Sequence, residues 1–205
     1  MKVPTVSGRH YAIARFKPDG TYLGSVTLSV PFTPQQIGAF STGDFLIAGV
    51  KMYQGGTPEG ESQLALVAPS GQFLKLVDLT GDPNAQSPPG NSNEGDWFMS
   101  ASLSEIVADG PNLLLVRPTQ NTPVFSISPG GEATSVRLEI PENYALHDLK
   151  INGAEWIGLI ARNVSGLDSQ LLSFDRSTGK VMGDMCIRRE SGSRSPVPTA
   201  MRSHL

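Results

Sequence analysis

The chain has 205 residues and a formal net charge of −3, and 39% of its residues are hydrophobic. It contains 22 glycines and 16 prolines, a share well above the usual one, which indicates many turns between short elements. Charged residues make up 17%, which argues against a solvated helical bundle or a coiled coil. The length suits one domain or a pair of small ones.

The charge is unevenly distributed. The last twenty residues hold four arginines against one glutamate, whereas no basic run passes through the rest of the chain. A nucleic-acid-binding protein is expected to present a concentrated Lys/Arg face, so this class is disfavoured. The segment 186–205 is also rich in Ser and Pro, and we predict a disordered basic tail there.

The single cysteine, Cys186, excludes an internal disulfide framework. The first ten residues contain no apolar core of the length found in signal peptides. No segment approaches the roughly 18 apolar residues that span a bilayer. We therefore expect a soluble chain without a membrane span, and the sequence leaves its cellular compartment unknown.

Apolar and polar residues alternate with a period of two over most of the chain, which predicts β-strands. Segment 72–79 places Leu74 and Leu76 on one face and Lys75 on the other. Segments 21–28 and 133–140 alternate in the same way. Segment 100–110 has some helically spaced apolar residues, but it ends in Asp-Gly before another apolar run, so we predict a strand there too.

Two sets of glycine turns alternate along the chain. The first set consists of Pro18-Asp19-Gly20, Pro69-Ser70-Gly71, Pro129-Gly130-Gly131 and Ser177-Thr178-Gly179. The second set consists of turns at Gly43, Gly110 and Gly153, each followed by an apolar strand. Because Pro presets φ and Gly adopts positive φ readily, both sets predict tight hairpins.

The repeating order is strand, turn, strand, longer link, strand, turn, strand, at a spacing of about fifty residues. Tandem four-stranded antiparallel units of this length are typical of β-propeller blades. The apolar runs 45–50 and 113–116 fit inner strands buried between blades, and the outer strands are expected to alternate with solvent. A β-sandwich is the alternative, but it gives no reason for turn chemistry to recur at blade length.

The runs Pro34–Ala48 and Ala68–Lys75 resemble six-bladed propellers of the NHL and TolB-like type. In that family a blade reads Pro, Ile, then Gly-Asp or Gly-Asn, an aromatic residue and a small apolar strand. The resemblance covers residues 11–185 and concerns the blade pattern alone. It implies a propeller fold and brings no catalytic motif.

The predicted blades do not add up to a closed ring, which needs at least about four blades. We expect about fourteen strands in three and a half blades. Three resolutions exist: the C-terminal residues return to close the ring, a homodimer completes a larger ring, or the chain is a fragment. The sequence favours the fragment. The predicted boundaries are a half blade at 10–30, blades at 32–79, 99–140 and 142–185, and the tail 186–205.

No sequence pattern predicts a catalytic, cofactor-binding or metal-binding site. The chain contains neither a G-x-S-x-G nucleophile motif nor a nucleotide-binding glycine motif. Adjacent strand residues point to opposite faces, so Asp148 is not expected to orient His147 as a catalytic acid would. The oxygen-rich linker 80–97 matches no EF-hand spacing, and we predict a solvated loop. Trp156 is expected in the core.

Propellers usually bind ligands at one end of the central channel, where the loops that enter the inner strands meet. By blade position, the candidate binding residues are Gln35, Gln36, Ser102, Ser104, Tyr144 and His147, with Glu105 and Asp148 as nearby acids. We therefore expect a binding or interaction scaffold, rather than an enzyme, for a protein or small-molecule ligand and without a cofactor. The alternative is a fragment of a metal-dependent propeller hydrolase or lactonase whose ligands lie mostly outside this chain.

Overall fold

The structure is a computed structural model that describes residues 10–52, 58–79, 105–116, 123–162 and 169–185. The described residues form fourteen β-strands and no helix, which confirms the all-β prediction. The expected tail at 186–205 and the expected solvated loop at 80–97 lie outside the described residues. No described segment forms a helix of the length and apolar character that crossing a bilayer requires.

The strands form one hairpin and three four-stranded sheets, all antiparallel and all in chain order. The N-terminal hairpin consists of β1 (Tyr11–Phe16) and β2 (Tyr22–Leu28). Blade 1 consists of β3 (Thr33–Ala39), β4 (Phe45–Met52), β5 (Pro58–Val67) and β6 (Phe73–Leu76). Blade 2 consists of β7 (Glu105–Asp109), β8 (Asn112–Val116), β9 (Pro123–Ile127) and β10 (Ala133–Arg137). Blade 3 consists of β11 (Tyr144–Asn152), β12 (Glu155–Arg162), β13 (Ser169–Asp175) and β14 (Val181–Met185).

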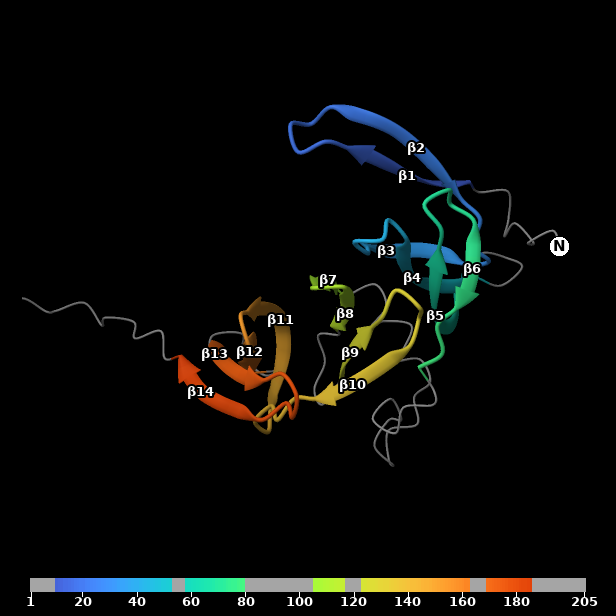
Figure 1. Ribbon diagram of the computed structural model, residues 1–205. Helices are drawn as coiled ribbons and strands as arrows, with labels where there is room; N and C mark the ends of the chain where they lie inside the picture. The colour runs from blue at the N-terminus through green and yellow to red at the C-terminus, as the bar shows by residue number, and fades with distance from the viewer. Residues whose placement is uncertain (1–9, 53–57, 80–104, 117–122, 163–168, 186–205) are drawn as a thin grey trace, which may run out of the picture.

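The sheets follow one another around an open arc (Figure 1). The first strands of the blades, β3, β7 and β11, lie on the concave side, and the last strands, β6, β10 and β14, lie on the outside. The described strands do not close into a ring. This is the arrangement of propeller blades, with the ring incomplete, as the repeat of turns predicts.

Apolar side chains fill each of the three interfaces along the arc. Leu46 and Leu66 of blade 1 pack with Phe125 of blade 2. Leu114 of blade 2 packs with Phe174 of blade 3 in a second cluster. A third cluster joins blade 1 to the N-terminal hairpin. Because every blade buries apolar residues on the faces that meet its neighbours, burial of apolar surface between sheets holds the arc together.

The second strands of blades 1 and 2 contain long buried runs. In β4 all residues from Phe45 to Val50 are buried, and in β8 the run Leu113–Val116 is buried, which confirms the prediction for both apolar runs. Trp156 in β12 is only 3% exposed, so its assignment to the core is also confirmed. Residues of β4 and of β8 pack into two clusters each, one on either face of their sheet, and this explains the absence of polar alternation in these two strands.

The prediction of regular alternation in the outer strands is wrong for β6. Leu74 and Leu76 are 50% and 48% exposed, and Lys75 between them is exposed as well. The register with β5 shifts at this point, so that Leu74 is an extra residue without a partner across the ladder. A bulge of this kind breaks the period of two. In β10, by contrast, Val136 packs against the core cluster as the alternation predicts.

Tight hairpin turns occur at all seven glycines that the sequence singled out, and each of them has a φ between +58° and +93°. These residues are Gly20, Gly43, Gly71, Gly110, Gly131, Gly153 and Gly179. Side chains disfavour this left-handed region, so the recurring glycines are explained by backbone conformation.

Candidate functional site

The candidate site lies on the first strands of the blades, on the concave side of the arc. Neighbouring first strands lie side by side, as β3 and β7 do. Of the predicted binding residues, Gln35 and Gln36 belong to β3, and Tyr144 and His147 belong to β11. Ser102 and Ser104 lie outside the described residues.

Two of the predicted residues occupy β-bulges. In the ladder of β3 with β4, Pro34 and Gln36 have partners and Gln35 has none. In the ladder of β11 with β12, Leu146 and Asp148 have partners and His147 has none. Both unpaired residues, Gln35 and His147, are exposed. Bulges are frequent next to functional sites because the extra residue lets a strand re-aim one side chain.

The bulge at His147 corrects the assumption of regular alternation in this strand. Leu146 and Leu149 are three residues apart, yet both pack into the cluster between blades 2 and 3. In a regular strand, residues three apart point to opposite faces. Because the bulge interrupts the period of two, that period no longer predicts that His147 and Asp148 point to opposite faces. The carboxylate of Asp148 is instead engaged by a lysine.

Lys150 connects the first strands of two blades. Its Nζ lies 3.0 Å from Oδ1 of Asp148 on the same strand and 3.1 Å from Oε1 of Glu105 on β7. Burial acts to raise the pKa of Asp148, but hydrogen bonding to Lys150 and its positive charge outweigh this effect and hold the pKa below its ordinary value. The two carboxylates raise the pKa of Lys150. Hence the pair Asp148 and Lys150 stays ionised at neutral pH.

Tyr144 is held by its neighbours in blade 3. Its side chain is buried, and its hydroxyl accepts a hydrogen bond of 3.2 Å from Nε2 of Gln170 on β13. The guanidinium of Arg162, its cross-strand partner, lies 5.5 Å from the centre of the ring. Such cation–π and hydrogen-bonding contacts orient a buried tyrosine within its sheet. Of the four described candidates, Tyr144 is thus the one that offers least surface to a ligand.

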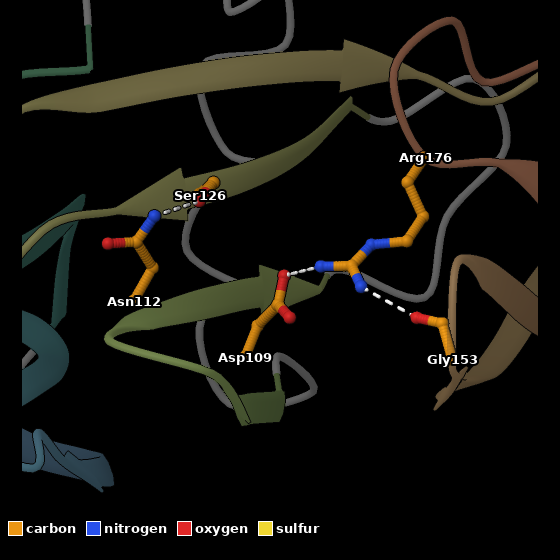
Figure 2. A network of polar contacts seen from close by, with 5 residues as sticks. All are labelled: Asp109, Asn112, Ser126, Gly153 and Arg176. Carbon is orange, nitrogen blue, oxygen red and sulfur yellow. Dashed lines mark hydrogen bonds and ion pairs between the residues drawn. The ribbon is translucent and has the colours of Figure 1, made fainter.

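A second polar network joins blades 2 and 3 at their tight turns, away from the bulges (Figure 2). Arg176 follows β13 and donates hydrogen bonds to the carbonyl oxygen of Gly153, at 2.9 Å, and to the carboxylate of Asp109. Its guanidinium also lies 5.9 Å from the ring centre of Trp156. Asn112 donates to Oγ of Ser126 within blade 2. Of these contacts, the one between Arg176 and Asp109 crosses from blade 3 to blade 2, and we assign it to joining the blades.

Lys150 and Arg176 were not among the residues singled out from the sequence. Lys150 stands two positions after Asp148, so it falls on the same face of β11, and this spacing was the available signal. Arg176 gives no such signal, because its partner Asp109 is 67 residues away and belongs to another blade.

The concave side of the arc therefore carries polar groups from all three blades. The first strands present an exposed amide at Gln35, an exposed imidazole at His147 and the charges of Glu105, Lys150 and Asp148. These groups can donate and accept hydrogen bonds and can pair with charged ligands. Within the described ranges, no three His, Cys, Asp or Glu side chains are grouped closely enough to hold a metal ion.

Comparison with known proteins assigns the chain to no family. No family model matches the sequence, and no curated protein matches it. One similar solved structure is described as a protein of unknown function from Bacteroides caccae. The match has 16% identity and a TM-score of 0.39, and it covers 82% of this chain and 52% of that one. The chain thus spans about half the length of that structure.

Proposed function

We propose that the chain is part of a β-propeller of the NHL or TolB-like type and acts as a binding or interaction scaffold. The concave surface that carries Gln35 and His147 is the binding surface. One observation carries the proposal: on β3 and on β11, one of the two residues selected from the sequence is the exposed extra residue of a bulge. Two such bulges in separate blades place an exposed polar residue on each of two first strands, β3 and β11.

The ligand class that this surface suits is small and polar, or a polar segment of a protein. Gln35 and His147 offer hydrogen-bond donors and acceptors, and Lys150 lies between two carboxylates. The charges on this surface are of both signs. Such a mixture of groups can recognise a ligand with hydroxyl, amide or zwitterionic groups.

The proposal is tested by nuclear magnetic resonance of ¹⁵N-labelled protein titrated with mixtures of sugars, amino acids and dipeptides. We expect saturable shifts of amide signals around Gln35 and His147, and their loss in the double variant Gln35→Ala, His147→Ala. Ser25→Ala, at an exposed serine of β2, is the matched control and should leave the shifts unchanged. Shifts that survive in the double variant would refute the assignment of the surface.

A second experiment on the same protein distinguishes the scaffold from the alternative function, a fragment of a metal-dependent propeller hydrolase or lactonase. Thermal unfolding is recorded with Ca²⁺, Mg²⁺, Mn²⁺ or Zn²⁺ and then with a chelator. A scaffold predicts an unchanged melting temperature. A metal enzyme predicts that one cation raises it, since a ligand that binds only the folded state stabilises that state. The increase should then disappear in Asp148→Asn.

A further inference from the structure

The hairpin between β11 and β12 turns at the sequence Asn152-Gly153. Asn152 is the last residue of β11 and pairs with Glu155, so the loop consists of Gly153 and Ala154 alone. Asn152, Gly153 and Ala154 are all exposed. This is the one Asn-Gly step in the sequence. Asparagine is a chemically labile residue, and a glycine after it leaves the side-chain amide open to attack because glycine has no Cβ.

The backbone N–H of Gly153 is not engaged by its own turn. Four other turn glycines donate this group to the carbonyl oxygen three residues earlier, and a fifth donates it to the one four residues earlier. These glycines are Gly20, Gly43, Gly71, Gly131 and Gly179. Gly153 donates no such bond to any residue that the structure describes. Its nitrogen is therefore not held by a hydrogen bond within the described chain.

The side-chain amide of Asn152 is equally unconstrained. It makes no hydrogen bond with another described residue. By contrast, Nδ2 of Asn112 donates a hydrogen bond of 3.2 Å to Oγ of Ser126. A Cβ built on Gly153 would meet no atom within 4 Å beyond its chain neighbours, so the space beside the turn is open. An exposed amide carbon thus stands next to an exposed backbone nitrogen.

The corresponding turn of blade 2 has the sequence Asp109-Gly110. Its glycine has a φ of +59°, and that of Gly153 is +58°. Arg176 lies between the two turns and donates hydrogen bonds to the carboxylate of Asp109 and to the carbonyl oxygen of Gly153 (Figure 2). The side chain before the glycine is therefore bound in blade 2, whereas Asn152 is unbound in blade 3.

We propose that Asn152 is a site of spontaneous deamidation, with water as the other reactant. The nitrogen of Gly153 loses its proton to solvent and attacks Cγ of Asn152, and the side-chain nitrogen takes up a proton and leaves as ammonia. Water then opens the cyclic imide at either of its two carbonyl groups, which gives aspartate or isoaspartate at this position. One water is consumed and one ammonia is released, without oxidation or reduction. The site does not depend on binding at the concave surface.

The two products differ in their effect on the contact with Arg176. In isoaspartate the main chain runs through the former side chain, so a carbon atom is inserted into the backbone just before Gly153. This atom shifts Gly153 relative to β12 and moves its carbonyl oxygen away from Arg176. Aspartate leaves the backbone unchanged and adds only a negative charge. We therefore expect the isoaspartate form to be the less stable of the two.

The full-length protein is incubated in ¹⁸O-labelled water at mildly alkaline pH, and its peptides are analysed by mass spectrometry with fragmentation that separates the isomers. We expect ¹⁸O to accumulate at residue 152 in both isomers, and faster than at Asn112 or at the exposed Asn143, which is followed by the bulky Tyr144. A synthetic peptide of residues 148–157 is the reference. Absence of label at residue 152 after this peptide has converted completely would overturn the proposal, as would equal labelling of the three asparagines.

Two glycine variants test the attacking residue. Gly153→Ala retains Asn152 but adds a Cβ beside the attacking nitrogen, so deamidation should slow at least about tenfold. Gly110→Ala is the matched control, because Gly110 has nearly the same φ and equally open surroundings, and Asn152 should deamidate in it at the unmodified rate. Equal rates in the two variants would overturn the role of Gly153.

The effect on the blades is measured separately. The isoaspartate form is purified by ion exchange, and its thermal unfolding is compared with that of Asn152→Asp, which has the same charge and the ordinary backbone. The isoaspartate form should have the lower melting temperature. Equal melting temperatures would show that the inserted atom does not disturb the contact of Gly153 with Arg176.

Discussion

The backbone N–H of Glu139 donates a hydrogen bond of 2.9 Å to the carbonyl oxygen of Gly179 in the next blade. The turn around Gly179 thus has two roles, since it closes the outer hairpin of blade 3 and attaches that hairpin to the end of blade 2. The pair Ser29 and Gly71 repeats the contact between the N-terminal hairpin and blade 1. A turn glycine recurs at these sites both for its conformation and for close approach to the neighbouring sheet.

Gly179→Ala is expected to destabilise the protein by about 2–4 kcal/mol, because the substitution adds backbone strain at a φ of +71° to a collision of the new Cβ with the carbonyl oxygen of Arg137. The matched control is Gly110→Ala. Its φ is +59°, but no atom lies within contact of an added Cβ, so about 1–2 kcal/mol is expected. Urea unfolding of both variants checks the difference. Equal losses would show that the contact between blades has no energetic role.

The network of Arg176 is expected to couple blades 2 and 3. In a double-mutant cycle with Arg176→Met and Asp109→Asn, we expect a coupling energy of about 1–2 kcal/mol, since both side chains are partly buried. The measurement is urea unfolding of the two single variants and the double variant. The exposed pair Lys150 and Glu105 serves as the comparison and should give a coupling below about 1 kcal/mol. Additive effects at Arg176 and Asp109 would contradict the assignment.

Acid is expected to destabilise the protein through Asp175. Hydrogen bonds from the side chains of Ser177 and Thr178, and from their backbone N–H groups, lower the pKa of this carboxyl to about 2. The unfolded chain, with the ordinary value of 3.8, binds the proton more readily, so the contribution is present above pH 4 and is lost as the pH falls toward 2. In Asp175→Asn the melting temperature should fall less between pH 5 and pH 2 than in the unmodified protein, as measured by circular dichroism. Parallel curves would contradict the prediction.

Close packing of first strands predicts the effect of a small substitution at Gly38. An added Cβ would collide with Ile106 and Leu113 of blade 2, so Gly38→Ala should cost about 1–3 kcal/mol. Gly183→Ala in β14 is the control, because its nearest neighbour, Oγ of Ser173, is 3.5 Å from the added Cβ. Thermal unfolding should show a clear decrease for the first variant and little change for the second. The opposite order would mean that blades 1 and 2 are not packed as described.

The repeating architecture could be predicted because its signals are local. A period of two marks the strands, and the turn glycines mark where each hairpin closes. The number of strands and the half blade at the N-terminus follow from counting these two signals along the chain. None of this required knowledge of a contact between distant residues.

The features that could not be predicted depend on contacts between distant residues or on ladder register. No sequence pattern around Gln35, Leu74 or His147 predicts a β-bulge, in which one strand has an extra residue that its partner strand does not match. The partners Asp109 and Arg176 lie 67 residues apart and meet only because blade 3 packs beside blade 2. Position in the repeat did select Gln35 and His147 for the candidate site, although it could not reveal that both are bulged.

The order of strands in the sheets has a consequence for folding. Each described sheet is built from consecutive strands, so every ladder joins segments that are close along the chain and the contact order is low for a β-protein. Blades of this kind can form as separate cooperative units, and each new one adds an interface with its neighbour. Native-state hydrogen exchange should accordingly show opening that begins at the two ends of the arc, with the amides of β8 and β9 in the middle blade exchanging last.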